Sequence, residues 1–302
     1  MNDFTLLGGT ANRELAAAVA SHLSVELGNC EIKRFPDSEI SVQLHQSVRG
    51  QEIFIIQSTA PPVDSHLIEL LALADACRRA SARRIVAVVP YFGYARADKR
   101  QGSRQPIMAS MVARLLEAGG IDHLMTVDLH APQIEGFFNI PVDSLAAAPV
   151  FYKALEAIPQ PFVVVSPDSG RIPMALQFAQ QLSAPIAVLQ KQRESGTQTE
   201  ITHVIGEVQD KTCLIVDDII ATGGTLISSI EALLQAGARP QLTVAATHGL
   251  LIGDALEKLS HSNLHHIFVT DTVLVKQHGA KLQVVSISRM IAQSIAKMLK
   301  SH

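Results

Sequence analysis

The sequence predicts two α/β domains, each built on a mainly parallel β-sheet flanked by helices. Short apolar segments of strand length alternate with amphipathic helical segments along the chain, a pattern typical of parallel sheets covered on both faces. The length of 302 residues exceeds one average domain. Residues 124–130 and 162–168 both run from an apolar strand into acidic residues or histidine, which indicates two similar halves. We therefore expect domains at 1–147 and 148–287, with a C-terminal helix at 288–302 that packs back on the first.

Individual elements follow from the spacing of apolar residues. Seven short apolar segments are predicted strands: Glu52–Ile56, Ile85–Val89, Leu124–Val127, Phe162–Val165, Ile186–Leu189, Leu242–Ala246 and Ile267–Val269. A further predicted strand, Cys213–Val216, precedes a helix that ends near Gly237. Another helix follows Asp64 and Ser65, which are candidate N-caps. One face of that helix is apolar and consists of Leu67, Leu70, Leu71 and Ala74.

Composition restricts the class of protein. The chain is 47% hydrophobic, and the formal net charge of −3 gives no general attraction to nucleic acid. No apolar stretch reaches the length of a membrane span, and the N-terminal residues lack the basic start of a signal peptide, so we expect a cytoplasmic protein without a membrane partner. The isolated cysteines Cys30, Cys77 and Cys213 are expected to be buried thiols.

The most informative segment is 214–225, which reads Leu-Ile-Val-Asp-Asp-Ile-Ile-Ala-Thr-Gly-Gly-Thr. It follows a predicted parallel strand, and open α/β sheets bind ligands at the carboxyl ends of such strands. The two glycines let a phosphate approach the backbone, and the threonines and the helix start supply donors. Asp217 and Asp218 would instead accept hydrogen bonds from sugar hydroxyls, directly or through a magnesium ion. The segment therefore predicts a site for a ribose that carries a 5-phosphate.

The first half holds a second group of polar residues. Residues 34–39 join a phenylalanine to two carboxylates in a proline-containing turn, and residues 90–100 follow a buried strand. With Arg104, the second segment brings four cations within nine residues, which suits a polyphosphate, while Phe35 could stack on a base. His130 directly follows its strand, where the magnesium ion of a nucleotide could be held.

These segments together resemble one enzyme family. The loop at 217–225 resembles the signature loop of phosphoribosyltransferases. With residues 64–71, 75–81, 90–96 and 128–138, in this order and spacing, the chain resembles ribose-phosphate pyrophosphokinases along nearly its whole length. The resemblance implies two phosphoribosyltransferase-like domains and a magnesium-dependent reaction. ATP and ribose 5-phosphate would give AMP and phosphoribosyl pyrophosphate (PRPP) for nucleotide biosynthesis. The family's usual assembly implies a homodimer or homohexamer.

The resemblance also implies roles for residues that match the family's segments. ATP would bind mainly to the N-terminal half, through Phe35, Asp37, Ser38, Glu39, Arg96, Ala97 and Asp98. Ribose 5-phosphate would bind to the C-terminal half, through Arg193, Asp217, Asp218, Ala221, Thr222, Gly223, Gly224 and Thr225. Lys191 and Arg193 would be catalytic, and His130 and Asp168 would serve the metal, Mg²⁺.

Some positions depart from the family pattern, and two alternatives stay open. Ala221, Gly223 and Ala97 stand where the larger branch of the family usually has Asp, Ala and Gln, and Gln192 interrupts its usual basic triplet. A phosphoribosyltransferase would share the loop at 217–225 without needing the nucleotide residues of the first half. A noncatalytic regulatory homologue is the other alternative.

Overall fold

The computed structural model of the chain describes residues 3–300 except 101, 157, 159–160 and 195–197, and within 191–202 it describes the backbone only. The chain divides into two compact units. The first comprises Met1–Ala146, Thr272–Leu274 and Ser286–His302, and the second Ala147–Asp271 and Val275–Val285. The chain thus passes from the first unit to the second between Ala146 and Ala147, and its C-terminal helix belongs to the first unit.

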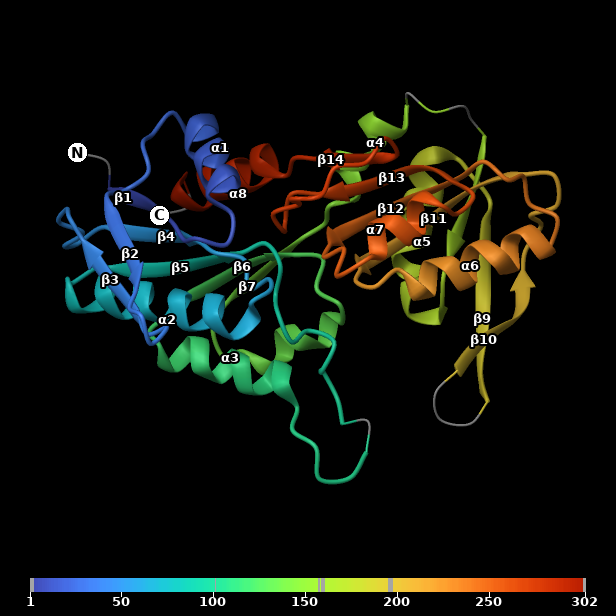
Figure 1. Cartoon of the computed structure of the whole chain (residues 1–302). Coiled ribbons are helices and arrows are strands. Elements are labelled where there is room, and N and C mark those ends of the chain that lie inside the picture. The colour runs from blue at the N-terminus through green and yellow to red at the C-terminus, as the bar shows by residue number, and fades with distance from the viewer. Residues whose placement is uncertain (1–2, 101, 157, 159–160, 195–197, 301–302) are drawn as a thin grey trace. The chain divides into compact units, whose positions relative to one another are not determined.

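The sheet of the first unit is parallel and has the strand order β1-β4-β5-β6-β7 (Figure 1). Its strands are β1 (Phe4–Gly8), β4 (Glu52–Ile56), β5 (Arg84–Val89), β6 (His123–Val127) and β7 (Val142–Leu145). Every neighbouring pair is parallel, so the carboxyl ends of these strands meet at one edge. A separate antiparallel ribbon pairs β2 (Cys30–Arg34) with β3 (Ile40–Leu44). The turn of this ribbon is residues 35–39.

Helices cover both faces of this sheet, as the apolar strands require. They are α1 (Arg13–Leu23), α2 (Val63–Arg79), α3 (Met108–Ala118) and α8 (Ser288–Lys300), with a 3₁₀ helix, η1 (Pro132–Phe137). Figure 1 shows α2 and α3 on one side of the sheet and α1 and α8 on the other. Alternate residues of a strand pack on opposite faces of the sheet. Ile53 and Ile55 pack in the core formed with α2 and α3, while Phe54 is buried on the opposite face. Ile291 and Ile295 of α8 are fully buried, and α8 packs against α1.

The sheet of the second unit has the strand order β10-β9-β8-β11-β12-β13-β14. Its strands are β8 (Phe162–Ser166), β9 (Ile186–Glu194), β10 (Gln198–Ile205), β11 (Thr212–Ile220), β12 (Leu242–Gly249), β13 (Leu264–Thr270) and β14 (Leu282–Val285). The edge pair of β9 and β10 is antiparallel, and the other pairs are parallel. The carboxyl ends of β8 and β11 are therefore neighbours.

Helices again pack on both faces of the second sheet. They are α4 (Ala148–Leu155), α5 (Ile172–Leu182), α6 (Gly224–Gln235) and α7 (Ala255–Ser260), with a 3₁₀ helix, η2 (Ser169–Arg171). Leu226 and Leu233 of α6 and Leu259 of α7 pack with one set of alternate strand residues. Phe151 of α4 and Phe178 of α5 lie with ring centroids 6.0 Å apart and belong to the core on the opposite face.

The structure corrects several sequence-based boundaries, and β9, β12 and β13 are each longer than predicted. β11 continues past Val216 to Ile220, because its hydrogen-bonded pairing with β12 continues to Ile220, so Asp217 and Asp218 lie in the strand rather than in the following loop. Helix α2 begins at Val63, with Pro62 in extended conformation before it. Asp64 and Ser65 therefore lie in the first helical turn, and the prediction that they are N-caps is wrong.

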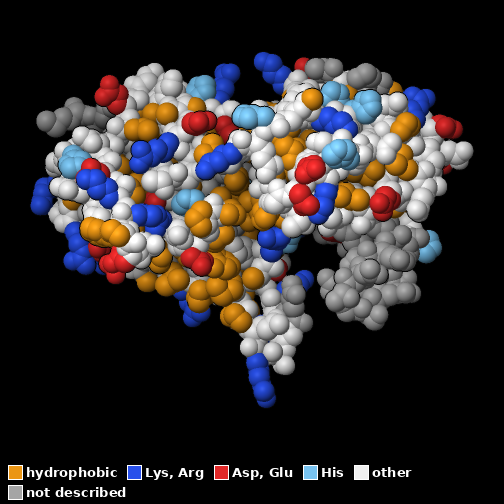
Figure 2. Space-filling model, in the orientation of Figure 1, with side chains coloured by type: hydrophobic (Ala, Val, Ile, Leu, Met, Phe, Trp, Pro, Cys, Tyr) orange, Lys and Arg blue, Asp and Glu red, His pale blue; other side chains and the backbone are white. Residues whose placement is uncertain are grey.

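Charged side chains of both signs are interspersed on the visible face of each unit, in keeping with the small net charge (Figure 2). Hydrophobic side chains gather in the lower part of the first unit in this view. Ile68 of α2 and Leu115 of α3 are among the exposed apolar residues, at 52% and 40% of their full accessibility. In the part of the chain that the structure describes, every helix is too short or too polar to span a membrane.

Candidate active site

The acidic pair lies near the carboxyl end of β11. Asp217 pairs with Ala246 of β12, and its carboxylate accepts a hydrogen bond of 2.8 Å from the backbone N–H of Asp218. Both residues are buried. Two adjacent carboxylates out of water require a counter-charge.

Arg171 supplies that counter-charge. It ends η2, which follows β8, and β8 is the sheet neighbour of β11. Its Nη1 lies 3.3 Å from Oδ2 of Asp218, and its Nε lies 4.0 Å from Oδ1 of Asp217. The guanidinium is largely buried, with 12% of the side chain exposed. The sequence alone does not indicate a role for Arg171, because its partners are 46 and 47 positions away and only the sheet order brings them together.

The pKa of Asp217 is shifted from its ordinary value. Burial raises the pKa of Asp217 well above its ordinary value, and the charge and side-chain hydrogen bond of Asp218 raise it further. Arg171 and the backbone N–H of Asp218 oppose the rise without reversing it. Ionisation of Asp217 therefore lowers the stability of the folded state. Carboxylates with such raised pKa values are common at functional sites.

We expect Asp217→Asn to raise thermal stability at pH 7. A raised folded-state pKa means that the folded protein holds the proton more tightly than the unfolded chain, whose aspartates titrate near about 4. The folded wild-type protein therefore loses stability as the pH rises from the unfolded-state pKa through the folded-state pKa of Asp217. Asparagine does not ionise, so the variant avoids this loss. The difference in Tm between variant and wild type, measured by calorimetry from pH 8 downward, should shrink as the pH falls.

The exposed Asp254, which forms a surface ion pair with Lys258, supplies the control. Asp254→Asn should give no stabilisation at pH 7. A difference in Tm for Asp217→Asn that grows on acidification would contradict the direction assigned to the pKa.

A turn suited to a phosphate follows the acidic pair. Gly223 adopts φ of +79°, and a Cβ there would lie 3.3 Å from Cγ of Leu259, so both conformation and space favour glycine. Helix α6 begins at Gly224, and the first N–H groups of a helix have no partner within it. Thr222 and Thr225 are exposed, and Ile252 donates to the carbonyl of Ala221 and fixes the start of the turn. The turn thus presents hydroxyl and backbone donors to an anion.

Asp168 lies at the same edge of the sheet as the acidic pair. It follows β8, and Val165 of β8 pairs with Ile215 of β11. Its Oδ1 accepts a hydrogen bond of 2.9 Å from the N–H of Gly170, and its carbonyl accepts one of 2.7 Å from Ser166. The structure thus gathers Asp168, the acidic pair and the turn at 221–225 at one edge of the second unit.

The other predicted metal residue, His130, belongs to the first unit. It is half-buried and lies just beyond the carboxyl end of β6. Among the described residues, no group of three or more His, Cys, Asp or Glu side chains is arranged to hold a metal ion. Mg²⁺ prefers oxygen ligands and usually keeps several waters, so the carboxylate of Asp168 fits such an ion better than an imidazole does.

The predicted nucleotide turn caps the β2–β3 ribbon. The N–H of Phe35 donates to the carbonyl of Glu39 at 2.8 Å, and the N–H of Ser38 to that of Phe35 at 2.9 Å. Oδ1 of Asp37 accepts a hydrogen bond of 3.1 Å from the N–H of Glu39. Phe35 is 54% exposed. An apolar ring held out in water by an ordered turn is available to stack on a flat ligand.

The second predicted nucleotide segment follows β5. The hydroxyl of Tyr94 donates to the carboxylate of Asp64, and Ala97 donates to the carbonyl of Tyr94 at 2.9 Å. Asp98 accepts a hydrogen bond of 2.8 Å from Gln133 of η1. Arg96 is exposed. Residues 90–100 follow β5, and the segment with His130 follows β6. Because β5 and β6 are neighbours in the sheet, both segments start at adjacent positions on its edge.

The predicted catalytic residues, Lys191 and Arg193, lie in β9, where their backbones pair with Ile201 and Thr199 of β10. Their side chains lie outside the part of the chain that the structure describes. Their roles stay predictions.

Two known protein domains match the chain. Residues 147–272 match the phosphoribosyl transferase domain, and residues 4–120 match the N-terminal domain of ribose phosphate pyrophosphokinase. The chain is thus a two-domain protein of the phosphoribosyltransferase type. A ribose-phosphate pyrophosphokinase of Thermotoga maritima is 42% identical over 303 residues, covering 99% of this chain and 96% of the relative. One of Brucella melitensis is 43% identical over 297 residues, covering 97% and 96%.

A solved structure agrees. The crystal structure of phosphoribosylpyrophosphate synthetase from Mycobacterium smegmatis superimposes with a TM-score of 0.92 at 37% sequence identity, covering 99% of each chain. The chain therefore belongs to the ribose-phosphate pyrophosphokinase family.

Proposed function

We propose that the protein transfers the β,γ-diphosphoryl group of ATP to the anomeric hydroxyl of ribose 5-phosphate, giving PRPP and AMP for nucleotide biosynthesis. The observation that supports the proposal most strongly is the arrangement of polar groups at one edge of the second unit. A buried acidic pair suited to sugar hydroxyls lies near the end of β11, and the turn that follows it offers hydrogen-bond donors suited to a 5-phosphate. Family membership over nearly the whole chain supports the choice of acceptor and donor.

In the proposed reaction, the oxygen of the anomeric hydroxyl attacks the β-phosphorus of ATP. The bond between the β-phosphorus and the oxygen that bridges it to the α-phosphate breaks, AMP leaves with that oxygen, and the hydroxyl proton is released. Asp217 and Asp218 orient the sugar through its hydroxyls, and the turn at 221–225 binds the 5-phosphate. Lys191 and Arg193 are proposed to stabilise the charge that builds on the phosphate oxygens.

The first unit is proposed to bind ATP. Phe35 would stack on the adenine, and Arg96 would pair with phosphate oxygens. Mg²⁺ is the proposed cofactor. His130 of the first unit and Asp168 of the second are each proposed to serve magnesium, mainly through its waters, and the metal would neutralise phosphate charge. Since both substrates are cytoplasmic metabolites, we propose a cytoplasmic location.

The assay that tests the function measures AMP formed from ATP and ribose 5-phosphate by pure, folded protein with magnesium. We expect AMP and PRPP in equal amounts. A phosphoribosyltransferase would instead consume PRPP together with a base or pyrophosphate. Absence of AMP under these conditions would favour a noncatalytic homologue.

We also propose a homodimer or homohexamer. Ile68 on α2 and Leu115 on α3 are exposed apolar side chains, and a second copy of the chain would remove such surface from water. Light scattering gives the mass of the assembly, and Ile68→Lys should reduce that mass if α2 lies in the interface. The exposed Val284 of β14 is the control, and Val284→Lys should leave the mass unchanged.

A further inference from the structure

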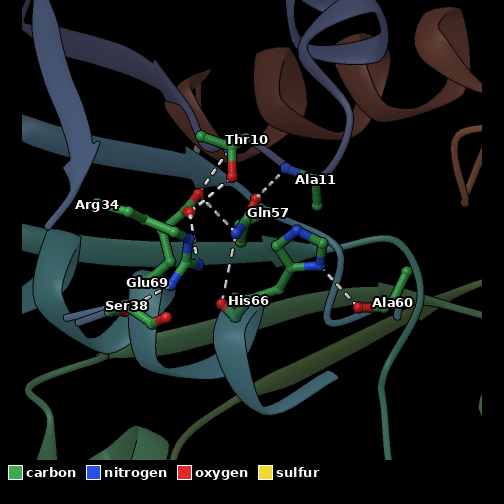
Figure 3. A network of polar contacts seen from close by, with 8 residues as sticks. All are labelled: Thr10, Ala11, Arg34, Ser38, Gln57, Ala60, His66 and Glu69. Carbon is green, nitrogen blue, oxygen red and sulfur yellow. Dashed lines mark hydrogen bonds and ion pairs between the residues drawn. The ribbon is translucent and has the colours of Figure 1, made fainter. Parts of the chain in front are cut away.

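A buried carboxylate in the first unit has no role in the proposed reaction. Glu69 lies in α2, and its side chain is 0% exposed. An isolated buried carboxylate is strongly unfavourable, so it needs donors on its oxygens. The N–H of Thr10 and Nε2 of Gln57 donate to Oε1 at 2.6 and 2.8 Å, and the hydroxyl of Thr10 donates to Oε2 at 2.6 Å (Figure 3).

The surroundings hold these groups in one arrangement. Gln57 is fixed at both ends, because its Oε1 accepts from the N–H of Ala11 at 3.1 Å while its Nε2 donates to Glu69. A Cβ at Gly9 would collide with the side chain of Gln57, so glycine is required for this close approach. Glu69 is therefore a charge at a fixed position, set by residues that follow β1 and β4.

Arg34 also faces this carboxylate. Nη2 of Arg34, the last residue of β2, lies 3.9 Å from Oε2 of Glu69 (Figure 3). Nη1 of the same guanidinium donates to the carbonyl of Ser38 at 3.3 Å. A single planar guanidinium thus connects the buried carboxylate to the backbone of the turn at 35–39.

The turn at 35–39 is exposed and contains a residue in an unusual backbone conformation, so a side-chain contact can stabilise it. Residues 34–39 are all exposed, and Ser38 adopts φ of +76°, a conformation that non-glycine residues rarely adopt. The carbonyl that Arg34 contacts belongs to that residue, which lies between Asp37 and Glu39. Losing the contact would let the turn populate other conformations and would reduce the fraction that is ready to bind.

We propose that Glu69 is a positioning residue for the nucleotide turn and acts through Arg34, which transmits the fixed position of the buried carboxylate to the carbonyl of Ser38. The proposal rests on the proposed function, because the ligand of the turn is the ATP of that reaction.

Arg34→Met is the first test, because an exposed side chain can be replaced without loss of the fold. We expect the KM for ATP to rise by about tenfold, with the KM for ribose 5-phosphate unchanged and kcat changed little, since a turn that is less often in its binding conformation lowers apparent affinity. Glu69→Gln, which keeps the shape and removes the charge, should give the same pattern. Arg34→Lys should recover only part of the effect, because an ammonium lacks the planar fork.

The double variant decides whether the two residues act together. If Glu69 acts through Arg34, Glu69→Gln combined with Arg34→Met should be no worse than Arg34→Met alone. Additive effects on the KM for ATP would overturn the proposal, and so would a normal KM in Glu69→Gln beside a raised KM in Arg34→Met. Asp75→Asn is the matched control on the same helix. It removes an exposed carboxylate that lies 2.6 Å from Nε of Arg79, and it should leave both KM values at the wild-type level.

A measurement without turnover separates this inference from the proposed function. By NMR, the amide protons of Phe35 and Ser38 should exchange with solvent several-fold faster in Glu69→Gln and Arg34→Met than in the wild type or Asp75→Asn. Unchanged exchange in a folded Glu69→Gln protein would overturn the positioning role even in an active enzyme. Faster exchange in a protein that forms no AMP would uphold the coupling of Glu69 to the turn and reject the proposed reaction.

Discussion

Lys191→Ala is expected to lower kcat by at least about a hundredfold, because a cation placed where charge develops in a transition state commonly contributes that much. The KM values for ATP and ribose 5-phosphate should change far less, since the proposed interaction strengthens only as phosphate oxygens gain charge. Steady-state rates with each substrate varied in turn separate the two effects.

Lys258 supplies the control for this variant. It is an exposed lysine of α7 whose Nζ lies 2.9 Å from Asp254, and Lys258→Ala should leave both kcat and KM unchanged. Turnover by Lys191→Ala at the wild-type rate would remove Lys191 from the mechanism. A raised KM with an unchanged kcat would reassign it to ground-state binding.

Strands were predictable from the sequence where burial alone defines them. β4 has the predicted bounds, Glu52–Ile56, because all five residues are buried and polar residues flank them. β11 was predicted too short, because its pairing with β12 continues through two carboxylates that no apolar pattern would include. The β2–β3 ribbon was not predicted, since it is half-exposed and short. Local hydrophobicity identifies a strand, but pairing partners decide where it ends.

Site residues were predictable where they share one segment of sequence. The acidic pair and the turn at 221–225 follow one another in the chain, so their chemistry can be read together. The contacts of Arg171 with Asp218 and of Arg34 with Glu69 could not be predicted, because each joins separate elements that the fold brings together. The pattern of a single sequence favours contacts between consecutive elements, but it does not decide which elements distant in the chain become neighbours.

Asp218→Asn and Phe35→Ala are expected to impair different substrates, and the two effects together test the proposed division of binding between the units. Asp218→Asn keeps the volume of a buried side chain and removes the charged acceptor proposed for sugar hydroxyls. Charge-assisted hydrogen bonds are worth about 1.5–3 kcal/mol, so the KM for ribose 5-phosphate should rise by roughly ten- to hundredfold. Phe35→Ala removes an exposed ring and should raise the KM for ATP by roughly fivefold or more through lost stacking.

Thermal unfolding shows whether each variant is folded before its kinetics are interpreted. Val284, an exposed apolar residue of β14, provides the control, and Val284→Ala should bind both substrates normally. In Asp218→Asn, the guanidinium of Arg171 loses its nearer carboxylate, which lies 3.3 Å away. If Arg171 and Asp218 act together, Arg171→Met should show the same defect in ribose 5-phosphate binding. If Phe35→Ala altered the affinity for ribose 5-phosphate and left that for ATP untouched, the assignment of ATP to the first unit would be wrong.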